Sequence, residues 1–329
     1  MKQPDSSQLS NTIHAALFAE DLRGVMLPIT TPFDAAGNVD LAGLSANIAK
    51  WNATGISGYV LLGSTGERVH LDEREYLEVI ETARAGIDHL PDGLNFIAGA
   101  GQQSTRGTIN EIKRVSEAVT VDAFLIITPH FYRPSITQQT LIAHYQSIAD
   151  ASPVPVILYS MPALTGIKIE PKTAARLSEH ENIIGIKDSS ADLAGLRQTI
   201  KLVEKDFAVL TGNGTVLYEA LSAGACGGIL AVGCVAPSVC IAIAQAVDRG
   251  DSSLAATLQK GLTPLAEAVT LRFGIGGLKA ALDLKGYIGG AVRAPLREPD
   301  TEARTEIRRC LELAESELTR LQSSETAIV

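Results

Sequence analysis

The sequence lacks an apolar run long enough to cross a bilayer, because no hydrophobic stretch reaches the roughly 18 to 20 residues that a spanning helix needs. It also lacks an excess of basic residues: 28 Lys and Arg stand against 37 Asp and Glu, a formal charge of −9. Proteins that bind nucleic acids without sequence preference need net positive charge. The sequence therefore predicts that neither a membrane nor a nucleic acid is a partner.

Cysteine is scarce, and targeting signals are missing. The four cysteines are Cys226, Cys234, Cys240 and Cys310, and three of them lie in one apolar region. This pattern is typical of buried thiols in a reducing compartment and not of a disulfide framework. Residues 1–20 have neither the apolar core of a secretory signal nor the arginines of a transit peptide. We expect an N-terminal arm over residues 1–20 and a cytoplasmic protein.

Signals for metals and organic cofactors are also missing. The 6 histidines are scattered without the spacing of metal ligands. No Gly-x-Ser-x-Gly nucleophile turn occurs, and no cysteine has an obvious base partner. Residues 99–104 superficially resemble a dinucleotide loop, but they lack the third glycine, and the next strand ends without the acidic residue that binds ribose. We therefore expect no metal and no cofactor.

What the chain does contain is an alternation of short apolar runs with segments of helical periodicity. Strands are predicted over residues 23–29, 56–62, 94–99, 123–128, 154–159, 183–187, 208–211 and 228–231. Helices are predicted over 41–54, 73–89, 104–118, 138–151, 171–178, 192–203 and 215–223, with N-caps such as Asp40, Asp72 and Ser135. Continuous runs of Val, Ile, Leu and Ala are typical of parallel strands covered on both faces. The pattern predicts an α/β protein with a closed (β/α)₈ TIM barrel, and an open doubly wound sheet is the alternative.

The last hundred or so residues are expected to be helical. Helices are predicted over residues 237–248, 252–270, 277–284 and 301–322. No linker rich in Pro, Ser or Gly and no block of charge separates residues 236–329 from the barrel over residues 21–235. We therefore expect a C-terminal helical extension that packs on the barrel as part of a single structural unit.

The carboxyl ends of the strands are where a barrel enzyme forms its active site. The second strand ends in Gly63-Ser64-Thr65-Gly66-Glu67, where hydroxyls and backbone N–H groups can converge on a carboxylate or phosphate. Taken alone, the same residues could be an ordinary Gly-rich turn that caps the next helix. The segment is a candidate anion-binding turn.

Two further candidates lie at the ends of neighbouring predicted strands. Tyr159 ends the fifth strand, and Lys187 ends the sixth. A phenol at the rim can transfer protons, although a core tyrosine with a solvated tip is the ordinary alternative. Lysine is depleted in strands, and desolvation favours a neutral amine that can form a Schiff base with a ketone. A solvated lysine at the barrel exit is the alternative for Lys187. The occurrence of all three features at the same end of different strands favours a functional site.

The three segments 63–67, 158–163 and 183–188 together resemble the dihydrodipicolinate synthase / N-acetylneuraminate lyase superfamily of pyruvate-dependent class I aldolases. The resemblance covers roughly residues 22–296 and implies a (β/α)₈ barrel with C-terminal helices, assembled as a homotetramer of two tight dimers. It implies that Lys187 forms the Schiff base and that Tyr159 moves protons. The implied binding residues for a pyruvate-type 2-oxo acid are Ser64 and Thr65 at its carboxylate, with Gly212 and Ile229 lining it by their backbone.

Two positions depart from the synthases of this superfamily. Those enzymes carry an arginine that grips the second substrate's carboxylate, and this chain has Leu164 there. They also carry a tyrosine that reaches across the tight dimer, and this chain has Phe131 followed by Tyr132. Residues 128–133 with 141–145, 187–190 and 272–296 resemble the 4-hydroxy-2-oxoglutarate aldolase branch in particular. In that branch the serine after Lys-Asp contacts the distal carboxylate, which points to Ser189.

We therefore predict a Schiff-base-forming lyase that cleaves a 4-hydroxy-2-oxo acid, with 4-hydroxy-2-oxoglutarate giving pyruvate and glyoxylate as the first choice. Residues 162–166 also resemble 2-keto-3-deoxy sugar acid aldolases, so such an aldolase or a related dehydratase is an alternative. Leu164 disfavours a 4-hydroxy-tetrahydrodipicolinate synthase. A non-catalytic barrel that binds 2-oxo acids is the alternative from another class, and it would be expected to lack Lys187 or Tyr159.

Overall fold

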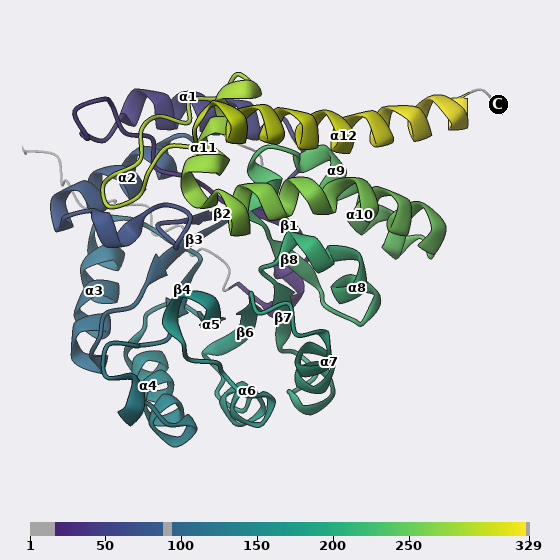
Figure 1. Ribbon diagram of the computed structural model, residues 1–329. Coiled ribbons are helices and arrows are strands. Elements are labelled where there is room, and N and C mark those ends of the chain that lie inside the picture. Colours follow the sequence, from purple (N-terminus) through teal and green to yellow (C-terminus); the bar gives the residue numbers. More distant parts are fainter. Residues whose placement is uncertain (1–16, 88–93, 327–329) are drawn as a thin grey trace, which may run out of the picture.

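The computed structural model describes residues 17–87 and 94–326, and its eight parallel strands close into a barrel (Figure 1). The strands are β1 Gly24–Pro28, β2 Gly58–Leu61, β3 Asn95–Ala100, β4 Ala123–Ile127, β5 Val156–Ser160, β6 Ile183–Asp188, β7 Ala208–Thr211 and β8 Gly227–Ile229. Each strand pairs with the next, and β8 pairs with β1. The predicted (β/α)₈ TIM barrel is confirmed, and the open sheet is excluded.

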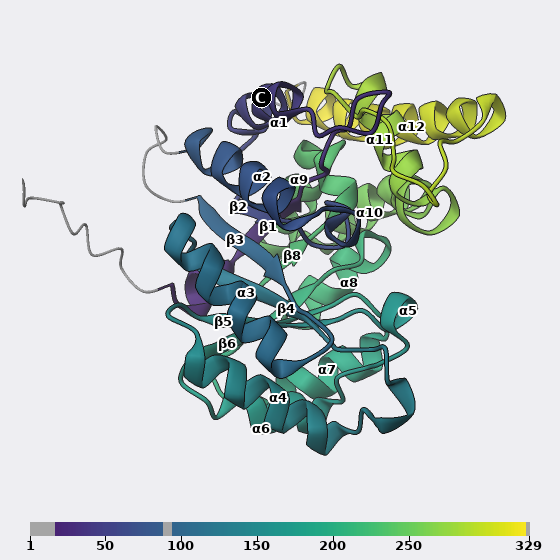
Figure 2. The same cartoon turned by 90° about the vertical axis from the view of Figure 1, so that its left-hand side faces the viewer.

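Helices surround the strands on the outside of the barrel (Figures 1 and 2). They are α1 Leu41–Trp51, α2 Glu73–Ala85, α3 Thr105–Ala118, α4 Gln138–Ala151, α6 Pro171–Ser178, α7 Leu193–Leu202 and α8 Leu217–Ser222. Short turns of helix join them to the strands: η1 Ala19–Leu22, η2 Arg68–His70, η3 Arg133–Ser135, η4 Gly214–Val216, η5 Ala231–Cys234 and α5 Pro162–Thr165. All eight strands and seven helices of the sequence pattern are present, although the last two residues of the helix expected over 73–89 lie outside the described residues.

Two details differ from the sequence pattern. The predicted N-cap Ser135 is wrong, because residues Arg133–Ser135 form a 3-10 turn with Pro134 in it. The cap of α4 is Thr137, whose side chain accepts a hydrogen bond from the Thr140 backbone N–H. Helix α5, which directly follows β5, was not predicted, because a single helical turn is too short to show a period. The caps Asp40 and Asp72 are confirmed.

The barrel has an inner and an outer core, because successive side chains of a strand point to opposite faces. Met26, Val60, Ile97, Leu125 and Ile157 belong to the buried cluster inside the barrel. Their neighbours along the strands pack outward against the helices in a second, larger cluster. Burying one large aliphatic side chain stabilises the fold by about 1.5–3 kcal/mol, so both layers contribute strongly. The same alternation decides which side chains at the strand ends face the lumen.

The C-terminal helices gather on one side of the barrel, where both views show them together (Figures 1 and 2). They are α9 Pro237–Asp248, α10 Ser252–Glu267, the π-helical turn η6 Ala268–Arg272, α11 Gly274–Leu284 and α12 Thr301–Thr326. Helix α10 packs against α9 and α12, and α9 contacts β1. The Trp51 indole on α1 donates to the Cys234 carbonyl at 2.9 Å and stacks on Tyr287, with ring centroids 5.1 Å apart. We propose that the chain divides into an arm (residues 1–20), the barrel (21–235) and the C-terminal helices (236–329), which form a single structural unit. Residues 1–16 of the arm lie outside the described residues.

All four cysteines are free; Cys234, Cys240 and Cys310 are buried as predicted, whereas Cys226 is only partly buried. Within residues 17–87 and 94–326, no helix combines the length and the apolar character needed to cross a membrane.

His144 on α4 makes the stability of the fold depend on pH. Its side chain is buried, with Nδ1 2.9 Å from the Thr105 hydroxyl of α3, and burial lowers the pKa of His144 to about 4. A free histidine has a pKa near 6.5, so between pH 6.5 and 4 the unfolded chain binds this proton more readily than the native one. His144 therefore destabilises the native state as the pH falls through that window.

We expect the free energy of unfolding to fall by about 2 kcal/mol more between pH 7 and pH 5 in the wild type than in His144→Gln, because glutamine does not titrate. Urea unfolding of both proteins at the two pH values measures the difference. Equal losses in the two proteins would show that His144 is not the titrating group.

Candidate active site

Tyr159 and Lys187 are neighbours because β5 and β6 pair in register at these two residues. Lys187 in turn lies opposite Leu210 of β7. Tyr159 and Leu210 belong to the cluster inside the barrel, so this register places the lysine at the lumen. The Lys187 Nζ lies over the Tyr159 ring, 4.4 Å from its centroid. Lys187 is 4% exposed and Tyr159 3%, so the amine does not point into bulk water.

The turn after β2 reaches Tyr159 through a hydroxyl. The Ser64 Oγ and the Tyr159 phenol oxygen are 3.0 Å apart, a hydrogen bond in which either group can donate. Thr65, the next residue, is buried. The Thr31 hydroxyl donates to the Gly66 carbonyl at 2.8 Å and so holds the far end of the turn. The turn, the phenol and the amine thus form one contiguous group.

Leu62 and Glu67 bracket this turn in an unusual backbone conformation. Their φ angles are +56° and +53°, in the left-handed region that residues other than glycine seldom adopt. Such positions persist only where the surrounding structure holds them, and they concentrate at functional sites. The shape of the turn is therefore imposed by its surroundings and does not follow from its own local preference.

Ser189 and Gly212 complete the group from β6 and β7. The Ser189 N–H donates to the Ser160 carbonyl at 3.0 Å, and the Gly212 N–H to the Asp188 carbonyl at 2.7 Å. A Cβ on residue 212 would lie 1.9 Å from the Ser189 Oγ and 2.7 Å from the Lys187 Cε. Glycine at this position therefore lets the backbone approach the lysine and serine side chains closely.

Ile229 lies inside the barrel, whereas the positions that depart from the synthases lie at the surface. Ile229 ends β8 with its side chain fully buried in the same inner cluster as Tyr159. Leu164 on α5 is 61% exposed. Phe131 and Tyr132 are exposed too, and their rings meet edge to face with centroids 5.1 Å apart. The structure thus brings Ser64, Tyr159, Lys187, Ser189 and Gly212 together in one connected group.

The loop after β3, which superficially resembles a dinucleotide loop, forms its hydrogen bonds within the protein. The Gly101 N–H donates to the Glu111 carboxylate at 2.8 Å, and the Gln102 N–H donates to the Thr108 hydroxyl at 2.9 Å. These N–H groups are occupied within the protein and do not face a pyrophosphate. In the part of the chain that is described, no group of three or more His, Cys, Asp and Glu side chains is arranged to hold a metal ion.

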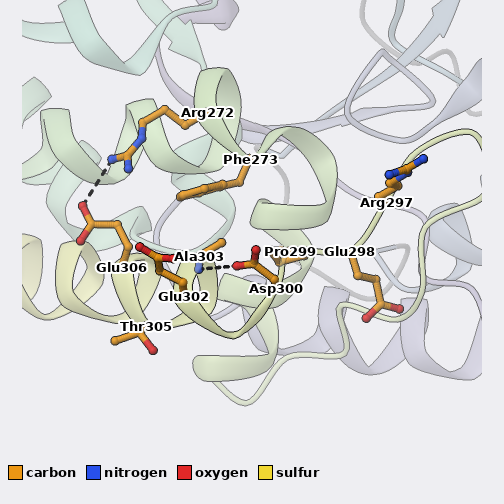
Figure 3. A pocket seen from close by; sticks show the side chains of 10 residues that line it. All are labelled: Arg272, Phe273, Arg297, Glu298, Pro299, Asp300, Glu302, Ala303, Thr305 and Glu306. Carbon is orange, nitrogen blue, oxygen red and sulfur yellow. Dashed lines mark hydrogen bonds and ion pairs between the residues drawn. The ribbon is translucent and has the colours of Figure 1, made fainter.

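A hollow beside α12 contains none of the candidate residues (Figure 3). Six of its ten lining residues are charged, and the lining consists of Arg272, Phe273, Arg297, Glu298, Pro299, Asp300, Glu302, Ala303, Thr305 and Glu306. Arg272 pairs with Glu306 at 3.3 Å, and the Asp300 carboxylate accepts from the Ala303 N–H at 2.9 Å, at the start of α12. We assign no function to this hollow.

Sequence reasoning assigned no role to two ionic residues next to the site. They are Glu67, at the end of the turn, and Lys279, on α11. Both side chains are buried, and the Lys279 Nζ lies 2.6 Å from the Glu67 Oε1. A lysine inside an apolar helical stretch is an available signal in the sequence. Nothing in the sequence, however, pairs it with a glutamate more than two hundred residues earlier.

Comparisons with known proteins identify a family to which this sequence is similar. The dihydrodipicolinate synthetase family matches residues 21–314. The curated 4-hydroxy-tetrahydrodipicolinate synthase of Ectopseudomonas mendocina is 34% identical over 275 residues, which cover 84% of this chain and 92% of that protein. The enzyme of the same name from Methanothrix thermoacetophila is 34% identical over 287 residues, which cover 87% and 95% of the two chains.

Two solved structures with pyruvate bound are similar as well. One is the chloride-inhibited dihydrodipicolinate synthase of Acinetobacter baumannii, with a TM-score of 0.83, 30% identity and coverage of 89% of this chain and 99% of that one. The other is a prophage protein of E. coli K12 described as belonging to the dihydrodipicolinic acid synthase family, with a TM-score of 0.82, 29% identity and the same coverage.

Proposed function

Since this chain belongs to the dihydrodipicolinate synthetase family, we propose that it is a Schiff-base-forming lyase that acts on a pyruvate-type 2-oxo acid through Lys187. The observation that carries the proposal is the buried Lys187 amine over the Tyr159 ring, with the Ser64 hydroxyl 3.0 Å from the phenol. An amine in its neutral form attacks the C2 ketone of the substrate, and loss of water gives a protonated imine. No cofactor and no metal takes part in this proposal.

For a 4-hydroxy-2-oxo acid, the imine is an electron sink for cleavage. Removal of the proton from the C4 hydroxyl turns that carbon into an aldehyde, and the electrons of the C3–C4 bond pass into an enamine on Lys187. Protonation at C3 and hydrolysis of the imine then release pyruvate and restore the amine. The Tyr159 phenol is the group in reach for these proton transfers, directly or through the Ser64 hydroxyl.

The turn from Gly63 to Gly66 is proposed to hold the C1 carboxylate. Ser64 and Thr65 supply hydroxyl and N–H donors beside the amine, and a fixed carboxylate aligns the C3–C4 bond for cleavage. Gly212 leaves room for the substrate next to Lys187. Ile229 is proposed to line the substrate by its backbone. Ser189, whose hydroxyl lies against Gly212, is placed to receive the distal carboxylate of a dicarboxylic substrate.

Which reaction the protein catalyses is a separate question. The names of the relatives favour one reaction, whereas the residue at position 164 argues against it. The curated relatives are named 4-hydroxy-tetrahydrodipicolinate synthase, which favours condensation of pyruvate with a second substrate. Leu164 disfavours the synthase, because an exposed leucine on α5 cannot make the charge-assisted contact of the synthase arginine. We propose cleavage of 4-hydroxy-2-oxoglutarate to pyruvate and glyoxylate, with the synthase as the second candidate.

A product assay decides between the two reactions. Purified protein is incubated with a panel of 4-hydroxy-2-oxo acids, and pyruvate and aldehyde are both quantified. In parallel, it is incubated with pyruvate and the aldehyde co-substrate of the synthase. Pyruvate and glyoxylate from 4-hydroxy-2-oxoglutarate support cleavage, and consumption of pyruvate in the second assay supports the synthase. Loss of water without C–C scission would identify a dehydratase instead.

The assembly and location follow as further parts of the proposal. We propose a homotetramer of two tight dimers, in which the exposed Phe131 and Tyr132 lie at the interface between chains. Free cysteines agree with a reducing compartment such as the cytoplasm.

A further inference from the structure

Glu67 is a buried carboxylate at the end of the turn that is proposed to hold the substrate's carboxylate. Its side chain is 1% exposed, and its backbone has a left-handed φ of +53°. The Glu67 N–H donates to the Ser64 carbonyl at 3.3 Å, which ties its backbone directly to a proposed binding residue. The backbone position of Glu67 is therefore linked to that of Ser64 in the binding turn.

Both oxygens of the Glu67 carboxylate are engaged. Oε1 lies 2.6 Å from the Nζ of Lys279, whose side chain is 2% exposed. Oε2 lies 3.0 Å from the His70 Nδ1 and accepts from the Arg293 N–H at 3.2 Å. Lys279 and Arg293 come from α11 and the segment after it, so the partners of the turn belong to the C-terminal region.

The side chains of Lys279 and Arg293 are themselves held in place by further contacts. The Lys279 Nζ donates to the Ala291 carbonyl at 2.6 Å and lies 4.4 Å from the centroid of the Phe33 ring. The Arg293 guanidinium binds both oxygens of Glu75 and lies on the same ring, 4.3 Å from its centroid. Burial lowers the pKa of the Lys279 ammonium, and the Glu67 carboxylate opposes part of that effect.

We propose that the buried Glu67–Lys279 ion pair is a positioning device, which lets the C-terminal helices hold the anion-binding turn in its strained shape so that Ser64 and Thr65 face the substrate's carboxylate. The inference rests on the proposed function, because it assumes that this turn binds a carboxylate beside Lys187. Neither residue is proposed to touch the substrate.

The energetics of buried ion pairs support a positioning role. Taking two charges out of water costs about as much as their attraction returns, so such a pair contributes little net stability, whereas removing one partner alone is strongly destabilising. The pair sits where a non-glycine backbone is held at positive φ, a conformation that the surroundings must impose. What the pair provides is therefore a fixed place for Glu67 and not a large contribution to folding.

The experiment uses two double variants that leave no single buried charge, Glu67→Gln/Lys279→Met and Glu67→Met/Lys279→Met. The protein is incubated with increasing pyruvate and sodium borohydride, and the fraction of Lys187 that carries the reduced adduct is measured by peptide mass spectrometry. The matched control is Lys285→Met/Glu315→Gln, which removes an ion pair of α11 and α12 that is partly exposed. Thermal unfolding of each protein checks the fold.

We expect both double variants to fold and to need roughly 10-fold more pyruvate for half-maximal trapping, equivalent to weakening one hydrogen bond to a charged group. The maximal extent of trapping should be unchanged, because Lys187 is intact, and the control should match the wild type. A merely structural role would lower the unfolding temperature and leave the half-maximal pyruvate concentration unmoved, and that result would overturn the inference. A wild type that pyruvate does not label would overturn the proposed function, and the inference with it.

Discussion

Replacing Lys187 by methionine is expected to abolish turnover, with a loss of roughly 10⁴-fold or more in kcat, as for removal of other covalent nucleophiles. Methionine has a similar length and no amine, so no imine can form with any 2-oxo acid. Because Lys187 is buried over a tyrosine ring inside the barrel, an apolar side chain fits its surroundings. The variant should therefore unfold at the same temperature as the wild type or above it.

The matched control is Lys285→Met, a lysine at the end of α11 that is one-third exposed and pairs with Glu315. It should keep wild-type turnover, since it contacts no candidate residue. Steady-state kinetics on the pyruvate-releasing reaction measures both variants. If Lys187→Met kept even a tenth of the activity, catalysis through an imine on this residue would be refuted.

Replacing Tyr159 by phenylalanine is expected to reduce turnover by roughly 10²- to 10⁴-fold, the usual contribution of a positioned general acid or base. Phenylalanine keeps the ring under the Lys187 Nζ and removes only the hydroxyl that lies 3.0 Å from Ser64. Binding of pyruvate should persist, because the carboxylate donors of the turn after β2 remain. The loss should consequently appear in kcat more than in the affinity for pyruvate.

Tyr145→Phe is the control for this change. Tyr145 is a fully buried tyrosine on α4 whose hydroxyl donates to the Ile126 carbonyl at 3.1 Å, outside the barrel lumen. Removing that hydroxyl should lower stability and leave kcat near the wild-type value. Near-normal rates in Tyr159→Phe would remove this phenol from the proton transfers.

The sequence predicts the barrel and the candidate residues because each depends on a local pattern. Continuous apolar runs separated by helical periods specify the strands, and residues at strand ends must share one rim of a closed barrel. Tyr159 and Lys187 could therefore be grouped before their register was known. That register, and the contact of Ser64 with the phenol, needed the structure, because strand pairing is a long-range property.

The support of the site could not be predicted in the same way. Glu67 and Lys279 are joined by the packing of α11 on the barrel, and no spacing in the sequence encodes a contact between residues so far apart. The single turn α5 and the 3-10 turn that displaces the expected cap at Ser135 are too short to have a period.

Imine formation at Lys187 is the central step of the proposed reaction, and trapping that imine is the most direct test. Wild-type protein is treated with pyruvate and sodium borohydride, digested and analysed by peptide mass spectrometry, with samples lacking pyruvate and the Lys187→Met variant in parallel. We predict that the mass of reduced pyruvate is added to the peptide containing Lys187 in the wild type, only when pyruvate is present. An unmodified Lys187 peptide under conditions of turnover, or labelling of a different lysine, would contradict the account.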